Sequence, residues 1–131
     1  MKTSFVLAAA ACLLALGGAA HAAQTIASSA MFGGSLQDRA QCIVRNVGTS
    51  PVSVTVTIFD ESGNAVPASN FCTSPLGPGD NCSVFASISN GVAYACSATA
   101  AGSAKSLRGS LVLYDTVDPS DFEPLRSGQL R

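Results

Sequence analysis

Hydrophobic and polar side chains alternate along much of this chain, most regularly over residues 52–60. Valine and isoleucine occupy most of the alternate positions there, with serine and threonine between them. Successive side chains of a β-strand point to opposite faces, so the segment predicts a strand with one apolar and one hydroxylated face. Turn-forming residues at 46–51 and 61–64 predict where the strand begins and ends.

Three more segments alternate in a similar way, namely residues 82–89, 92–99 and 107–115. The first two are separated only by Asn90 and Gly91. Both residue types tolerate the positive φ angles that the tightest β-hairpin turns require. We therefore expect residues 82–89 and 92–99 to pair as neighbouring strands of one sheet.

Weaker strand patterns occupy residues 25–31, 41–47 and 65–71. Pro67 cannot donate a backbone hydrogen bond, so the last of these segments is expected at the edge of a sheet. Residues 98–105 predict a loop or at most one helical turn. Short strands separated by turn clusters are typical of an all-β, antiparallel β-sandwich, here of about seven strands.

The first 22 residues have a different character. Lys2 is followed by an uncharged, largely apolar run at 5–16 and by small residues on both sides of His21, which is the layout of a secretory signal peptide. A retained anchor is the alternative, but the run is shorter than the roughly 20 residues that span a membrane. Cys12 lies inside the run, which argues against a lipoprotein. We expect a secreted or periplasmic protein with no membrane span in the mature chain, and the alanine-rich leader resembles bacterial ones.

These patterns divide the chain into a signal peptide at 1–22, a β-sandwich domain at 23–115 and a C-terminal tail at 116–131. The tail is rich in aspartate, proline, serine and glycine. We expect it to be irregular and partly disordered, as chain ends often are.

Four cysteines follow the leader: Cys42, Cys72, Cys82 and Cys96. Disulfides form in the oxidising compartments to which exported proteins are sent. Four cysteines allow three pairings, and the sequence alone does not select one. We favour Cys42–Cys96, because both lie mid-strand on predicted inward faces, together with Cys72–Cys82, which flank a run of turn formers. The chain has no Cys-x-x-Cys pair and no histidine after the leader, so we expect neither a metal site nor a cofactor.

The charge pattern gives little indication of a partner. Without Lys2, six basic residues stand against eight acidic ones, so the mature chain carries a net charge near −2. The basic residues are scattered singly along the sequence and form no run. The pattern therefore does not predict binding to nucleic acid.

Catalysis is tested by elimination. His21, the only histidine, leaves with the leader, and no serine lies in a Gly-x-Ser-x-Gly motif. The usual general base for a serine or cysteine nucleophile is therefore missing, and we expect no enzyme. A pair of carboxylates could act instead, although charged loop residues are more often simply solvated. The candidates are Asp60 and Glu61 at a turn, and Asp115, Asp118, Asp121 and Glu123 towards the C-terminus.

Two aromatic residues lie at positions that the alternation makes outward. Phe85 interrupts the polar face of its strand, and Tyr114 shares an outward face with Arg108. Exposed aromatic side chains would indicate a partner surface. We favour the alternative that loops cover them.

A resemblance covers roughly residues 40–115. It is carried by Cys-Ile-Val-Arg-Asn-Val at 42–47, the alternating segment at 52–60, Leu-Gly-Pro-Gly at 76–79, Ala-Cys-Ser at 95–97 and Leu-Arg-Gly-Ser-Leu at 107–111. In these features the chain resembles a group of small, uncharacterised secreted bacterial proteins with the character of an immunoglobulin-like sandwich. The resemblance implies that fold, with a strand-to-strand bridge between Cys42 and Cys96, and implies no activity.

The sequence therefore favours a secreted or periplasmic, non-enzymatic binding or structural module. Its partner, a protein or another component of the cell envelope, would be recognised by loops or by an exposed sheet edge. One alternative is a small hydrolase that uses the carboxylates named above. A second is a secreted protease inhibitor whose contact loop is the stapled segment at 72–82.

Overall fold

The computed structural model describes residues 22–116 and 126–130, so all but the last residue of the predicted signal peptide lies outside it. The described chain is all-β, with one short 3₁₀ turn, η1 (Ala104–Ser106). The strands are β1 (Gln24–Ala27), β2 (Met31–Phe32), β3 (Arg39–Asn46), β4 (Val54–Asp60), β5 (Ala68–Asn70), β6 (Asn81–Ser87), β7 (Ala93–Ala100), β8 (Leu107–Tyr114) and β9 (Arg126–Leu130).

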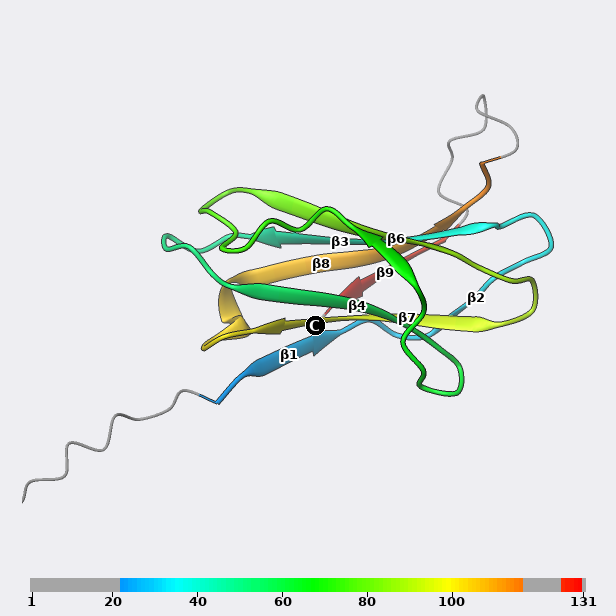
Figure 1. The fold of residues 1–131 in the computed structure, drawn as a ribbon, viewed down its shortest axis with the longest axis horizontal. Helices are drawn as coiled ribbons and strands as arrows, with labels where there is room; N and C mark the ends of the chain where they lie inside the picture. The colour runs from blue at the N-terminus through cyan, green and yellow to red at the C-terminus, as the bar shows by residue number, and fades with distance from the viewer. Residues whose placement is uncertain (1–21, 117–125, 131) are drawn as a thin grey trace, which may run out of the picture.

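The strands form two antiparallel sheets that pack face to face (Figure 1). In the four-stranded sheet, β7 lies in the middle, with β4 on one side and β1 and β2 along successive parts of the other. The five-stranded sheet has the order β5-β6-β3-β8-β9. The short strand β5 is at an edge of this sheet, as Pro67 led us to expect.

The core lies between the sheets and is made by the apolar face that alternation predicts. Val54, Val56 and Ile58 of β4 are buried against the inward residues of β3, β6, β7 and β8. The opposite faces carry serine, threonine and a few larger residues. The predicted apolar faces are therefore confirmed, because every second side chain of a strand lies on the same side and the apolar side is the one buried away from water.

The expected hairpin at Asn90 and Gly91 is wrong. Strands β6 and β7 lie in different sheets, so the turn crosses from one layer to the other. Both strands bury their alternating apolar residues by facing each other across the core. Gly91 does have a positive φ of 73°, and its N–H donates to the carbonyl of Gly33 at 3.0 Å.

Tyr94 stabilises the turn that connects β6 to β7. Its ring is buried at the start of β7, and its hydroxyl oxygen accepts a hydrogen bond from the backbone N–H of Ser89 at 2.8 Å. The turn is also tied to the chain before β3, since the N–H of Ile88 donates to the carbonyl of Asp38 at 2.9 Å. The crossing is therefore held by backbone and tyrosine contacts rather than by a β-ladder.

The expected irregular tail is wrong for its last described residues. Arg126–Leu130 forms β9, which pairs with β8 at the edge of the five-stranded sheet. Leu130 is 3% exposed and joins the core, so burial of this side chain favours a strand where the composition favoured a turn. Residues 117–125 of the predicted tail lie outside the described residues.

Asn46, which we placed in a turn, is the last residue of β3 and is 0% exposed. Its Nδ2 donates to the carbonyls of Ser50 and Leu76, at 2.8 Å and 3.0 Å, and its Oδ1 accepts from the N–H of Gly48 at 2.9 Å. The buried amide thus connects the loop after β3 with the loop before β6. A buried polar group is tolerated when its hydrogen bonds are made in this way.

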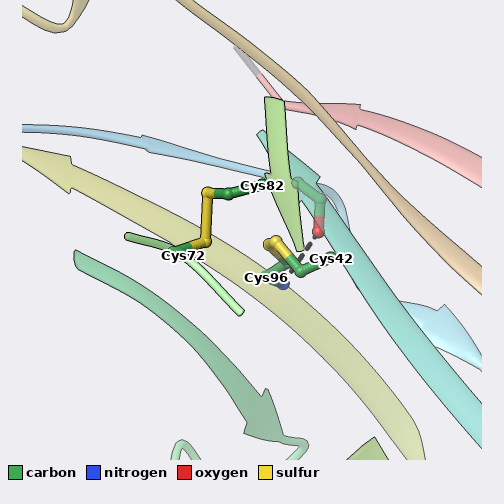
Figure 2. The surroundings of a disulfide bond; sticks show 5 residues. Cys42, Cys72, Cys82 and Cys96 are labelled. Carbon is green, nitrogen blue, oxygen red and sulfur yellow. Dashed lines mark hydrogen bonds between the residues drawn. A yellow bond between two sulfur atoms is a disulfide. The ribbon is translucent and has the colours of Figure 1, made fainter. Parts of the chain in front are cut away.

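Two disulfides, Cys42–Cys96 and Cys72–Cys82, join the cysteines in the pairs favoured above. The first connects β3 to β7 across the core, with 6.0 Å between the Cα atoms, and both cysteines are fully buried. The second ties the segment after β5 to β6 and has a Cα–Cα distance of 4.7 Å. Figure 2 shows the two bridges near one another, as expected from the inward positions of Cys42 and Cys82 on paired strands.

Candidate functional site

The candidate catalytic residue Asp60 caps the turn after β4. Its Oδ1 accepts hydrogen bonds from the backbone N–H groups of Ser62 and Asn64, at 2.9 Å and 2.8 Å, and its Oδ2 accepts from the Asn64 amide at 3.3 Å. Gly63 supplies the positive φ of 80° that the turn requires. An aspartate that accepts hydrogen bonds from the residues following it is a common turn device, and this accounts for the residue without catalysis.

Of the remaining candidate carboxylates, the structure describes Glu61 and Asp115. The Oε2 of Glu61 accepts a long hydrogen bond of 3.4 Å from the N–H of Ala93. Asp115 follows β8, whereas Asp118, Asp121 and Glu123 lie outside the described residues. Within residues 22–116 and 126–130, no group of three or more histidine, cysteine or acidic side chains is placed to hold a metal ion. In the same residues, no helix has the length and apolar character needed to cross a membrane.

Acid should remove the contribution of Asp60 to stability. Hydrogen bonds from Asn64 hold the pKa of Asp60 below its ordinary value of 3.8. A carboxylate with a lowered pKa in the folded state stabilises the fold above the pKa of the unfolded chain, and this stabilisation is lost as the pH falls through the folded-state pKa. We expect Asp60→Asn to lower the urea midpoint at about pH 7, and the difference from wild type to shrink below about pH 3.

The comparison of Asp60→Asn with wild type needs urea melts at both pH values. An equal midpoint difference at both would show that the charge of Asp60 is irrelevant and that only the side-chain geometry matters. Asp38 should behave in the same direction, because the Thr116 hydroxyl donates to it and lowers its pKa.

The stapled loop at 72–82 is pinned to the core at its centre. Leu76 is 2% exposed, and its N–H and carbonyl form a β-bridge with Val52, at 2.8 Å and 3.0 Å. Asn46 adds a further hydrogen bond to the same carbonyl. An inhibitor loop must present its central backbone to a protease, so this arrangement favours a structural role for the loop.

The outward side of the five-stranded sheet has a different chemistry. We call it the outer face and define it by the outward residues of four rows that cross the paired strands. The first row contains Asn81, Arg45 and Arg108; the second Phe71, Ser83, Ile43, Ser110 and Gln129; the third Ser69, Phe85, Gln41 and Val112; and the fourth Ser87, Arg39 and Tyr114. None of these residues is acidic.

Three of the six basic residues that follow the leader lie on the outer face. Arg45 and Arg108 are direct partners on β3 and β8, although 63 positions (108 − 45) separate them in the sequence. Arg39 is six positions from Arg45 along β3, which places it about 20 Å away at the other end of the strand. The fold thus brings Arg45 and Arg108 together, although basic residues form no run in the sequence.

Two shallow hollows meet near the middle of the outer face. One, of about 400 Å³, is lined by residues that include Arg45, Arg108 and Gln129. The other, of about 350 Å³, is lined by residues that include Phe71 and Asn81. Ile43 borders both hollows. They lie where the second row has serine on either side of Ile43, and we call the two hollows together the trough.

One aromatic residue, Phe71, lines the trough, whereas Phe85 and Tyr114 lie in the third and fourth rows. Phe85 is half-buried because the ring of Phe71 packs against it edge-on, with centroids 5.7 Å apart and an interplanar angle of 82°. Phe71 is itself 65% exposed. Tyr114 is half-buried, and this burial raises the pKa of its hydroxyl, while the nearby Arg39 guanidinium acts in the opposite direction. For Phe85 the expectation that a loop covers the ring is confirmed, because Phe71 belongs to the loop after β5.

The chain matches no protein-family model, no curated protein and no solved structure. Its chemistry must therefore be argued from its own residues. The outer face is the described surface on which exposed arginine and aromatic side chains occur together.

Proposed function

We propose that this protein is an exported, non-enzymatic binding module with an immunoglobulin-like sandwich, and that it binds a protein partner through the outer face. The observation that carries the proposal is the outer face itself, where Arg45, Arg108 and Phe71 line two shallow hollows and Phe85 packs against Phe71. Arginine and aromatic residues are enriched in protein–protein interfaces, which commonly have an apolar centre and a polar rim.

The immunoglobulin-like assignment is supported by two local features. The bridge between Cys42 and Cys96 connects the two sheets, and Tyr94, two residues before Cys96, bonds through its hydroxyl to the backbone of Ser89. Immunoglobulin domains combine such a bridge with a tyrosine in this position. The order of the outer strands departs from that pattern, because β8 pairs with β3 and the N-terminal strands β1 and β2 pair with β7.

Export is supported by the predicted signal peptide at 1–22 together with the two disulfides. Disulfides persist in secreted and periplasmic proteins, whereas the cytosol keeps thiols reduced. The resemblance to small secreted bacterial proteins agrees with this destination. A binding role outside the cytoplasm also suits a small domain that covalent bridges protect from unfolding.

The alternatives have weaker support. Both oxygens of Asp60 accept hydrogen bonds within one turn, so the carboxylate hydrolase lacks its clearest candidate. The inhibitor would need an exposed centre in the loop at 72–82, where Leu76 is buried.

Site-specific photocrosslinking in the native host would test the proposal. A photoreactive phenylalanine analogue replaces Ser83 or Val112 on the outer face, or Thr57 on the outward side of the four-stranded sheet as the matched control. All three positions are half-buried. We expect the two outer-face positions to crosslink to the same protein and Thr57 not to do so.

Equal crosslinking from Thr57, or none from either outer-face position, would contradict the proposal. Turnover of an ester or glycoside that disappears in the variant Asp60→Asn/Glu61→Gln would support the hydrolase instead.

A further inference from the structure

Arg45 and Arg108 form a pair of like charges that the rest of the described protein does not neutralise. They are direct cross-strand partners on the outer face, and both are exposed. Like charges at directly opposite positions destabilise a sheet. Within residues 22–116 and 126–130, neither arginine makes an ion pair with a carboxylate. An anion bound between the two side chains would relieve this repulsion.

Arg108 is already held in position. Its Nη1 donates to the backbone carbonyls of Lys105 and Leu107, at 2.9 Å and 2.7 Å. A guanidinium has five N–H donors, so several remain for a ligand after these contacts are made. An arginine that is fixed before binding loses less conformational freedom when the ligand arrives. The pair is therefore a prepared site for a carboxylate, which guanidinium groups bind in a bidentate geometry.

The surroundings select an extended acidic peptide over other anions. The trough beside the pair crosses the sheet from Phe71 on the β5 side to Gln129 on β9. Five strands about 4.8 Å apart give it a length of about 19 Å, which is about six residues of extended chain. The first row on one side of the trough is cationic and polar, whereas Phe85 and Val112 lie in the row on the other side. A peptide with acidic side chains on one side and apolar ones on the other would match both rows.

We propose that the trough binds an extended acidic peptide segment of the partner, with a carboxylate held between Arg45 and Arg108. This inference rests on the proposed function and names the chemistry of its partner. A second copy of the outer face does not supply the carboxylate, because none of its residues is acidic. Lys105, which borders a larger hollow together with Arg108, adds a further cation at this end of the face.

The test uses the oxidised protein and a phage-displayed library of random dodecapeptides. Selection is carried out in parallel on wild type, on Arg45→Gln/Arg108→Gln, and on the control Ala27→Glu/Thr55→Glu. The control changes the net charge by the same amount on exposed residues of the four-stranded sheet. Near-equal thermal melts of the three proteins establish that all are folded.

We expect wild type and the control to enrich peptides in which aspartate or glutamate alternates with aromatic or aliphatic residues. The affinity of such a peptide, measured by fluorescence anisotropy, should fall at least about tenfold for Arg45→Gln/Arg108→Gln, because each charge-assisted hydrogen bond is strong. Added salt should weaken the binding to wild type.

Failure to enrich acidic peptides, or equal affinity for Arg45→Gln/Arg108→Gln, would overturn the inference.

Vesicles of phosphatidylcholine with phosphatidylglycerol, and dextran sulfate, serve as further probes. If these bind wild type through the arginine pair while no peptide does, an anionic lipid or polysaccharide replaces the peptide as partner. If Ser83 still crosslinks to the partner in Arg45→Gln/Arg108→Gln, the peptide inference is wrong and the proposed function stands. If neither outer-face position crosslinks when both arginines are present, the proposed function is wrong.

Discussion

The variant Cys42→Ala/Cys96→Ala should have a free energy of unfolding lower than that of the oxidised protein by about 4 kcal/mol. The bridge closes a segment of 54 residues and connects the two sheets at fully buried positions. Cross-linking restricts the unfolded chain more when the closed segment is longer. Such a loss is a large share of the roughly 5–15 kcal/mol that stabilises a domain of ordinary size.

The matched control is Cys72→Ala/Cys82→Ala, which opens a segment of only 10 residues. The same relation gives about 3 kcal/mol for this bridge, and Cys72 is less deeply buried than the other three cysteines. Urea unfolding followed by circular dichroism, without reductant, measures both values. An equal or larger loss in the control would show that loop closure does not determine how the two bridges stabilise the domain.

Replacing Asn46 by alanine should lower the free energy of unfolding by about 3 kcal/mol, since three hydrogen bonds of about 1 kcal/mol each disappear. The amide joins the loop after β3 to the loop before β6 through the carbonyls of Ser50 and Leu76. Its backbone bonds to Asp80 and Gly79 do not depend on the side chain and should remain. The expected loss therefore comes from the amide alone.

Two further substitutions separate the hydrogen bonds of Asn46 from its volume. Asn46→Leu keeps most of the buried volume but makes none of the three bonds, so it should be about as destabilising as alanine. Asn81→Ala removes an exposed asparagine at the start of β6 and should change stability by less than about 0.5 kcal/mol. A melt of Asn46→Leu close to wild type would show that the buried amide is not needed.

The outer face suggests how a domain with low charge can still recognise a charged partner. Its net charge near −2 gives no long-range attraction towards acidic ligands. Arg45 and Arg108, paired on one sheet face and without a carboxylate partner among the described residues, nevertheless make a local positive potential. The partner is then selected at short range, by contacts in the trough, rather than by the overall charge of the protein.

Alternation along the chain was sufficient to predict most strands and the inward residues of β4, β6 and β8. The side of the strand on which a residue lies is a local property, because every second side chain of a strand points to the same side. The inward cysteines also led to the favoured pairing, since residues buried between two sheets can meet only across the core. Burial and the period of two residues are therefore what the sequence determined by itself.

The tertiary structure alone decided which strands are neighbours. Asn90 and Gly91 are compatible with a hairpin and with a crossing between sheets, and the choice depends on how the whole apolar interior is filled. β9 forms because β8 offers an unpaired edge and the core has room for Leu130, neither of which is visible from residues 126–130. The Arg45–Arg108 pair likewise exists only because β3 and β8 lie side by side, and a linear sequence does not contain the register that brings distant residues together.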